Sequence, residues 1–339
     1  MELKAHALMN SGLYTDGETL LKEIQAQWLC DKSVLNNETL FDMYDRLASV
    51  YRHFNLKDLS IEYNTLSLNL ADSLSDEKLQ MLANRTQYKL FLYIDRKASE
   101  ESLYKSIGLN ETSPLKRIKT DNDFDLCGIR ILKNETNEYG DIIGDLFRLL
   151  EYAEKNNFNR AKIHGYFLLA ICNLLNNTIA SIKLAKEYVD KAIDLSTFYG
   201  IVGYLWRLNN LNAIIEMRLN YDEEKVFKSF FTVFEILNNR GLLYIGNREL
   251  CHGNILALSN IGFYLQEHKF ESEFYEKMSL VSYTDKNRYA IFKNEKAKQP
   301  VQSFLVEQYN RAKNKLVLFI DSQPTDLLRD SQTNYFIIL

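Results

Sequence analysis

Proline is nearly missing from this sequence: Pro114, Pro300 and Pro324 are the only three among 339 residues. Proteins usually contain about 5% proline. Proline disrupts a helix interior because it lacks an amide hydrogen and clashes with the preceding turn. Glycine is also scarce, with 13 residues. The shortage of both residues predicts an all-α protein.

Other absences narrow the functional class. No apolar run approaches the roughly 18 residues of a membrane-spanning helix, and the N-terminal MELKAHALMNSG does not resemble a signal peptide. A formal charge of −4 is too small to steer the chain to nucleic acid or to an anionic membrane. Cys30, Cys127, Cys172 and Cys251 show no CxxC spacing, which favours reduced thiols over zinc ligands or disulfides. We therefore expect a cytoplasmic protein without a cofactor, a metal, a nucleic-acid partner or a membrane partner.

Apolar residues recur at helical spacing in paired segments. In 38–54 they fall three and four residues apart, a short polar break follows, and the same spacing resumes from Leu59 to Leu70. Two such helices joined by a short turn form an antiparallel helical hairpin. Comparable pairs occupy 4–24, 166–195, 206–237 and 256–281. Hairpins repeated at intervals of roughly 35–50 residues indicate a helical repeat array.

Small residues stand where the helices of a hairpin would touch. Ala48 on the first helix and Ser60 and Ser67 on the second allow the two axes to approach closely, while aromatic residues fill the gaps between hairpins. This pattern resembles the tetratricopeptide repeat over about 1–285, although Glu273 and Phe274 stand where a small residue is expected. The positions that carry the resemblance are Tyr44, Leu47, Ala48, Tyr51, Ser60 and Ser67, then Gly12, Tyr14, Gly17 and Leu21, and finally Ala185, Val189 and Ala192.

The resemblance implies a right-handed superhelix of antiparallel hairpins whose first helices line a concave groove. Four segments are predicted: tetratricopeptide-like hairpins in 1–107, an irregular connection in 108–139, further hairpins in 140–285 and a C-terminal cap in 286–339. The connection is expected because the helical period is lost around Pro114 and the Lys116–Lys119 cluster. In the cap, LVLFI and YFIIL either form short strands or continue as helix.

Signatures of catalysis are absent from the sequence, including the phosphate-binding loop, the GxGxxG and GxSxG motifs and HExxH. His252–Asn254 reads as a turn before a helix, and Asp121, Asp123 and Asp125 read as a solvated acidic loop without calcium-loop spacing. The cations from Lys116 to Lys119 read as solvated surface. An enzyme would have to use an unrecognised set, such as Asp121–Asp125 with His164 or His252, and we expect a non-catalytic protein.

The expected groove offers polar and charged side chains suited to a peptide. Asparagine both donates to and accepts from a peptide bond, and arginine pairs with a carboxylate. The candidate ligand-binding residues are Asp45, Ser49, Arg52 and His53 in the helix at 38–54, and Arg207, Asn210 and Arg218 in the helix at 202–219.

These features predict a protein- or peptide-binding α-solenoid that acts as a recognition or sensor module in bacterial or phage signalling or defence. The chain resembles the sensor regions of bacterial signalling ATPases, and alternatively peptide-pheromone receptors. A structural scaffold subunit is the other alternative. Because Met1 falls inside the first expected helix, we expect an N-terminal effector or partner subunit to cover that end.

Overall fold

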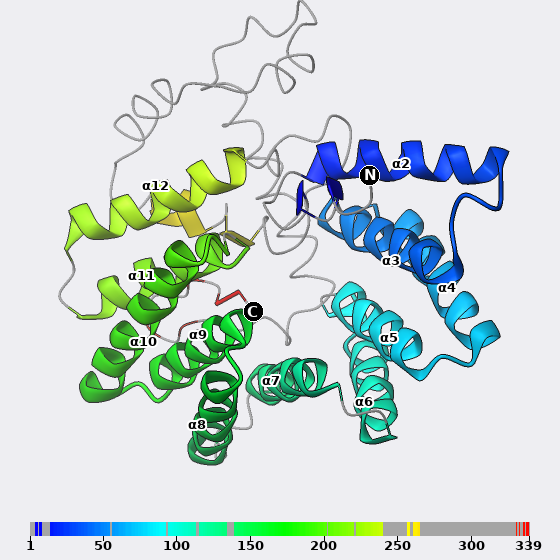
Figure 1. Cartoon of the computed structure of the whole chain (residues 1–339). Helices are drawn as coiled ribbons and strands as arrows, with labels where there is room; N and C mark the ends of the chain where they lie inside the picture. Colours follow the sequence, from blue (N-terminus) through cyan, green and yellow to red (C-terminus); the bar gives the residue numbers. More distant parts are fainter. Residues whose placement is uncertain are drawn as a thin grey trace, which may run out of the picture. The chain divides into compact units, whose positions relative to one another are not determined.

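The computed structural model describes residues 4–5, 7–8, 14–54, 56–92, 94–112, 115–133, 139–201, 203–219, 222–239, 256–257, 260–264, 330, 332, 335 and 337–338. The regular structure of these residues is helical, which confirms the all-α prediction (Figure 1). In chain order the helices are α2 (Tyr14–Cys30), α3 (Asn37–His53), α4 (Lys57–Leu74), α5 (Glu77–Phe91), α6 (Arg96–Thr112), α7 (Lys116–Leu132), α8 (Tyr139–Lys155), α9 (Asn159–Leu175), α10 (Ile179–Phe198), α11 (Leu205–Leu219) and α12 (Glu223–Asn239). No helix in this part of the chain is long and apolar enough to cross a membrane.

Some predictions fall outside the described residues. They include the turn at His252–Asn254, the second helix expected before residue 281 and the strand expected at 316–320. Of the last expected strand, Tyr335, Ile337 and Ile338 are described, and all three are buried.

The chain divides into two compact units. Unit 1 comprises Met1–Leu168 and Leu195–Gly203, and unit 2 comprises Leu169–Asp194 and Tyr204–Leu339. Two of the three boundaries fall inside helices, so the first part of α9 belongs to unit 1 and most of α10 to unit 2; the third lies between α10 and α11.

In unit 1 consecutive helices pack against each other as hairpins. α3 packs on α4, α5 on α6 and α7 on α8, and α3 also contacts α5. As Figure 1 shows, α3, α5 and α7 lie on one side of this unit and α4, α6 and α8 on the other. Side-chain caps begin several of the helices: Asn36 accepts from the Thr39 amide at 2.8 Å, and Asp76 from the Leu79 amide at 3.1 Å. The helical repeat organisation is therefore confirmed for this unit.

Buried serine side chains join the two helices in the α3–α4 and α5–α6 hairpins, and the sequence predicted the close contact of Ala48 and Ser60. The Ser60 hydroxyl of α4 donates to the Ala48 carbonyl of α3 at 2.7 Å. In the next hairpin the Ser99 hydroxyl of α6 donates to the Tyr88 carbonyl of α5 at 2.8 Å. All four residues are buried. A short serine side chain thus lets the helices approach closely and also satisfies its own hydroxyl.

Two clusters in the apolar core of unit 1 each span three successive helices. One cluster joins α3, α4 and α5 through Phe41, Ala71 and Leu79. The next joins α5, α6 and α7, with Leu103 of α6 and Ile129 of α7 at its centre. Because every helix contributes to the burial of its neighbours, apolar packing ties each hairpin to the next.

The irregular connection predicted for 108–139 is wrong over most of its length. α6 extends to Thr112, α7 fills Lys116–Leu132 and α8 begins at Tyr139. The helical period is hard to see in α7 because its buried positions include the polar residues Asn122 and Asp125. Both side chains bond to polar groups of neighbouring helices, and these bonds offset the cost of burying them.

At Gly165 in α9, the helix runs very close to its neighbours in unit 1. A Cβ built at this position would lie 2.7 Å from side-chain atoms of both Leu150 in α8 and Phe124 in α7. Gly144 in α8, by contrast, has nothing within 4 Å of such an atom. The glycine at 165 therefore permits a close approach that alanine would obstruct.

Unit 2 contains the hairpin of α11 and α12, which pack closely together. The aromatic ring of Phe230 in α12 contacts those of Tyr264 and Tyr335, with centroids 5.2 and 5.9 Å apart. Lys186 of α10 forms an ion pair with Glu216 of α11 at 3.1 Å. Residues near the C-terminus therefore contribute to the core of this unit.

Candidate functional site

Charged side chains from α3, α5, α7 and α9 gather on one face of unit 1. On each of α5, α7 and α9 two of them are four residues apart, a spacing that places both on the same side of a helix. We call this set the charged face: it consists of Asp45 on α3, Arg85 and Lys89 on α5, Asp121 and Asp125 on α7, and Arg160 and His164 on α9.

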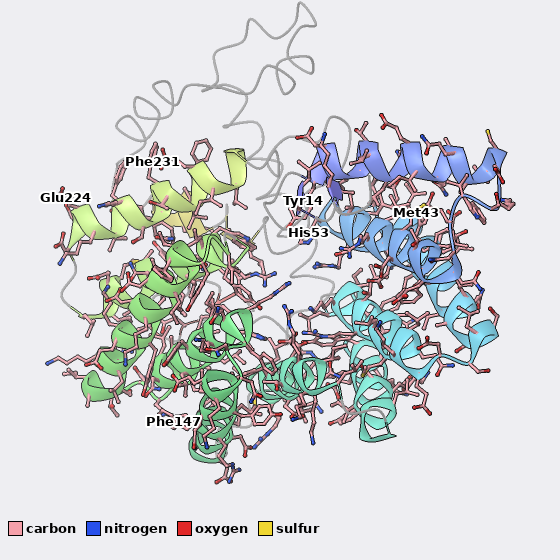
Figure 2. The ribbon with its side chains drawn as sticks, in the orientation of Figure 1. Tyr14, Met43, His53, Phe147, Glu224 and Phe231 are labelled. Atoms are coloured by element: carbon pink, nitrogen blue, oxygen red, sulfur yellow. The ribbon has the colours of Figure 1, made fainter. Side chains whose placement is uncertain are left out.

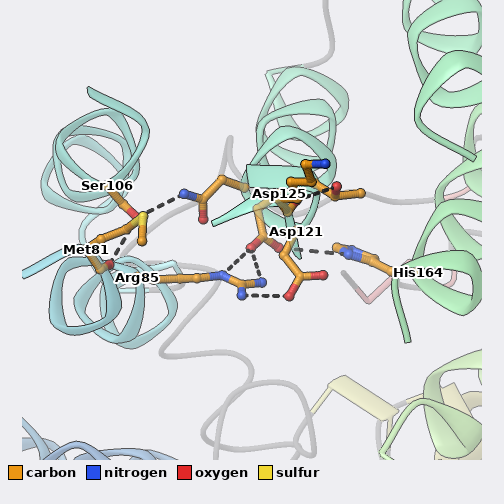
Figure 3. A network of polar contacts seen from close by, with 9 residues as sticks. Met81, Arg85, Ser106, Asp121, Asp125 and His164 are labelled. Carbon is orange, nitrogen blue, oxygen red and sulfur yellow. Dashed lines mark hydrogen bonds and ion pairs between the residues drawn. The ribbon is translucent and has the colours of Figure 1, made fainter. Parts of the chain in front are cut away.

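Arg85 lies at the centre of the charged face and links α5 to α7. Its Nη1 donates to Asp121 Oδ2 at 2.9 Å, while Nε and Nη2 donate to Asp125 Oδ2 at 3.2 and 3.0 Å (Figure 3). Burial lowers the pKa of Arg85, but Asp125 and Asp121 outweigh that effect and raise it. For Asp125, burial raises the pKa, and Arg85, Lys89 and His164 together bring it below its ordinary value. Both partners are therefore charged at neutral pH.

His164 adds α9 to the same network. Its Nδ1 lies 4.0 Å from Asp125 Oδ1 (Figure 3), and its ring contacts Phe124 with centroids 6.0 Å apart. Burial lowers the pKa of His164 to about 4, although Asp125 and Asp121 act in the opposite direction. The imidazole is therefore neutral near pH 7.

Lys89 lies one helical turn beyond Arg85 and is only partly buried. Within the described ranges, no carboxylate lies within ion-pair distance of its ammonium. The pKa of Lys89 is lowered to about 7, mainly by burial and also by Arg85 and Arg160, while Asp125 and Asp121 act in the opposite direction. The charge of Lys89 is therefore sensitive to pH near neutrality.

Asp45 brings α3 into the charged face. Burial raises the pKa of its carboxyl to about 6, while a hydrogen bond from Thr86 of α5 and the charge of Arg46 act against the rise. Its Oδ1 is buried and has no hydrogen-bond partner among the described residues. The charge of this carboxyl is therefore sensitive to pH in the range where most aspartates stay ionised.

Uncharged polar groups hold the helices that carry this face. Asn122 of α7 donates to the Ser106 hydroxyl of α6 at 2.9 Å, and Ser106 donates to the Met81 carbonyl of α5 at 3.0 Å (Figure 3). Asn64 of α4 donates to the Ala83 carbonyl of α5 at 3.0 Å. These buried bonds fix the rotation of α5 and α7, and so the direction of Arg85 and Lys89.

The candidate residues predicted on α3 lie in unit 1, and all are partly buried. Asp45 joins the charged face, and Ser49 follows it by one turn. Arg52 and His53 lie at the end of α3, where Arg52 Nη2 is 3.0 Å from His53 Nε2. The His53 ring stacks on Tyr14 of α2, with centroids 4.3 Å apart (Figure 2). A ligand-binding role for these four residues stays a prediction.

The candidates on α11 belong to unit 2, and two of them are closed to a ligand. Asn210 is 1% exposed and accepts a hydrogen bond from Asn260 at 2.9 Å. The Arg218 side chain is 3% exposed and bonds to Asp330 and Asn177. The expectation that these two residues face a groove is therefore wrong. Arg207 is partly buried, with its guanidinium 5.1 Å from the ring of Trp206.

The structure brings together Asp121, Asp125 and His164, which the sequence suggested only as an unrecognised catalytic set. Both carboxylates already accept hydrogen bonds from Arg85, so neither is placed as an unengaged general base. Instead of an acidic loop, Asp121 and Asp125 occupy one face of α7. No group of three or more potential metal ligands occurs in the described part of the chain.

Sequence reasoning missed Arg85, Lys89 and Arg160. A signal was present, because charged residues at i and i+4 in 77–91, 116–132 and 159–175 predict charged stripes on three helices. What the spacing could not show is that the three stripes meet.

Neither the protein-family models nor the curated protein sequences include one that matches this chain.

Proposed function

We propose that this chain is a non-catalytic protein- or peptide-binding repeat protein of the tetratricopeptide type, and that unit 1 recognises its ligand on the charged face. The observation that carries the proposal is the continuity of this face across α3, α5, α7 and α9, of which the first three each begin a hairpin. An extended segment lying across these helices would meet both signs of charge and the polar side chain of Ser49.

The chemistry of the face supports a polypeptide ligand. A peptide can form hydrogen bonds and ion pairs with partly exposed polar groups on a rigid helical scaffold. Few side chains or loops of the scaffold then lose conformational freedom on binding. The buried hydrogen bonds of Asn64, Ser106 and Asn122 keep the scaffold fixed. A role as a sensor in bacterial or phage signalling or defence is part of the same proposal, and it is supported by the resemblance of the hairpin pattern to the sensor regions of bacterial signalling ATPases.

A selection from a random peptide library displayed on messenger RNA tests the proposal. Enriched peptides are retested on two variants that receive the same substitution: Ser49→Arg next to Asp45 on the charged face, and Ser73→Arg on the exposed side of α4. We expect Ser49→Arg to weaken binding at least tenfold and Ser73→Arg to leave it within twofold. Failure to enrich any peptide, or equal binding by both variants, would refute the proposal.

A structural scaffold is the second candidate. It is favoured by apolar side chains at the C-terminal end of α10, where Phe198 is 80% exposed and the adjacent Tyr199 41% exposed. Apolar surface of this kind often marks contacts with another protein. A stable complex that dissociates on Phe198→Ser, but not on Ser49→Arg, would favour the scaffold.

A further inference from the structure

Arg218 in α11 is closed to an outside ligand because another part of the same chain already binds it. Its guanidinium forms an ion pair with Asp330, and the two side chains are 3% and 2% exposed. Nη2 also donates to the side-chain oxygen of Asn177, between α9 and α10. Among the described residues, Asp330 supplies the only carboxylate that pairs with this arginine. A buried arginine depends on such a partner, because an unpaired charge away from water is costly.

Asp330 belongs to a short stretch of chain that packs on unit 2. We call its described residues the docked segment: Asp330, Gln332, Tyr335, Ile337 and Ile338. Four of the five are buried, and Gln332 is exposed. The Tyr335 ring contacts that of Phe230 in α12, with centroids 5.9 Å apart. The Asp330 amide donates to the Tyr335 carbonyl at 2.9 Å. The docked segment thus contacts α11 through a carboxylate and α12 through an aromatic ring.

The contacts of the docked segment are those that a peptide ligand would make. Its carboxylate pairs with an arginine, its aromatic ring packs on another ring, and its two isoleucines are buried. None of its described residues lies in a helix, so its release breaks no hydrogen bond within a helix. Asp330 lies 112 residues beyond Arg218 along the chain. The docked segment can therefore leave α11 and α12 while the backbone hydrogen bonds of both helices remain formed.

We propose that the docked segment is an internal ligand that blocks a recognition site on α11 and α12, and that a partner peptide with a carboxylate and an aromatic side chain displaces it. This inference is independent of the proposed function, because the site lies in unit 2 and not on the charged face. The incoming carboxylate replaces that of Asp330, and the incoming ring covers the surface that Tyr335 leaves. Displacement therefore leaves neither an unpaired buried charge nor a newly exposed apolar surface.

The docked segment competes strongly because it belongs to the same chain. A tethered ligand acts at an effective concentration of up to about 1 mM, so a free peptide with the same contacts competes only near that concentration. Removal of the Asp330 charge should weaken the internal contact, because the guanidinium of Arg218 then gains more from water than from the docked segment. Asp330→Asn should therefore release the docked segment and open the site. A docked segment that is a permanent part of the core would instead unfold together with unit 2.

The rate of thiol modification at buried positions tests for this release. Ile338→Cys places a thiol in the docked segment and Val233→Cys places one in α12, at native side chains that are 2% and 0% exposed. Each is combined with Asp330→Asn or with the control Gln332→Ala, and peptide mapping identifies the modified site. We expect Asp330→Asn to accelerate modification at least tenfold at position 338 and less than twofold at position 233, and Gln332→Ala to change neither rate beyond twofold. Equal acceleration at both positions, or none at 338, would overturn the inference.

A synthetic peptide tests whether the opened site accepts a ligand. The probe is an acetylated, fluorescent peptide with the sequence of residues 330–339, and its anisotropy reports binding to the full chain. We expect the Asp330→Asn chain to bind it at least tenfold more tightly than the native chain does. A peptide with asparagine at the first position should bind at least tenfold more weakly, and Arg218→Met should abolish that difference. No binding by the Asp330→Asn chain up to about 1 mM peptide, or equal binding of both peptides, would overturn the inference.

Discussion

Replacement of Arg85 by methionine tests whether the ion pairs at the centre of the charged face hold α5 to α7. The Arg85 and Asp121 side chains are 15% exposed and that of Asp125 is 7% exposed. Methionine keeps much of the apolar stem of arginine but removes all of its donors. Two carboxylates would then lie largely buried without their guanidinium partner.

The expected loss of stability follows from this burial. Breaking a fully buried ion pair costs about 3–5 kcal/mol because the remaining charge stays desolvated, whereas exposed pairs contribute about 0–1 kcal/mol. Since a fraction of each side chain still reaches water, we expect Arg85→Met to lower the free energy of unfolding by about 2–3 kcal/mol at pH 7. Arg148→Met is the control, because the Arg148 side chain is 78% exposed; we expect a loss of at most about 0.5 kcal/mol.

The loss should depend on pH in a defined direction. In the native chain the pKa of Asp125 is lowered, so its ion pair stabilises the fold above the unfolded pKa of about 3.9 and is lost as pH falls through the folded value. In Arg85→Met, burial without the guanidinium raises the pKa of Asp125, and protonation relieves the cost as the pH falls. The difference between the two proteins should shrink to about 1 kcal/mol near pH 4.

Urea unfolding can be followed in unit 1 alone. The chain contains two tryptophans, Trp28 in α2 and Trp206 in α11. In a Trp206→Phe background, the fluorescence of Trp28 reports the unfolding of its own unit. A variant that also carries Asp121→Asn and Asp125→Asn should regain most of the lost stability, because no buried charge then remains unpaired.

Two results would contradict this reasoning. An equal loss at pH 7 and pH 4 would show that the cost of Arg85→Met comes from packing rather than from charge. A loss no larger than that of Arg148→Met would show that the ion pairs of Arg85 behave as exposed ones.

Three further predictions concern single positions. Gly165→Ala should destabilise unit 1 by about 1–2 kcal/mol because its Cβ would meet two side chains. In the same urea assay, Gly144→Ala should stabilise the unit by about 0.5–1 kcal/mol, because a Cβ there would meet open space. Two changes in stability of the same sign would contradict the packing around Gly165. Burial raises the pKa of Cys127 to about 12, so peptide mapping after treatment with a thiol reagent at pH 8 should find Cys30, which is exposed, modified and Cys127 intact. Asn36→Ala should cost about 1 kcal/mol by removing the cap of α3, and its rescue by Asn36→Asp would separate the cap from other effects.

Much of the helical organisation could be predicted from the sequence, because local features determine it. The scarcity of proline and the three- and four-residue apolar spacing in 38–70 predict the α3–α4 hairpin that the structure contains. The small residues Ala48 and Ser60 predicted a close contact, which the 2.7 Å hydrogen bond confirms. The same method failed in α7, because Asn122 and Asp125 are buried there through partners more than ten residues away in sequence.

The candidate site was less accessible to sequence reasoning. Asn210 and Arg218 were predicted to line a groove, yet both side chains are buried because Asn260 and Asp330 supply partners from distant parts of the chain. Lys89 is one of 41 basic residues and carries no motif. Only its position beside Arg85 and near Arg160 distinguishes it.

The sequence by itself determined that this protein is helical, that its helices pair as hairpins and where small residues let them touch. These properties depend on backbone geometry and on apolar spacing within one or two helices. The tertiary structure alone decided which charges meet on α3, α5, α7 and α9, and which remain without a direct partner. Pairing and desolvation depend on side chains from helices far apart in the sequence, such as those of Asp45 and His164. The spacing of residues within one helix does not show which of these helices lie close together in space.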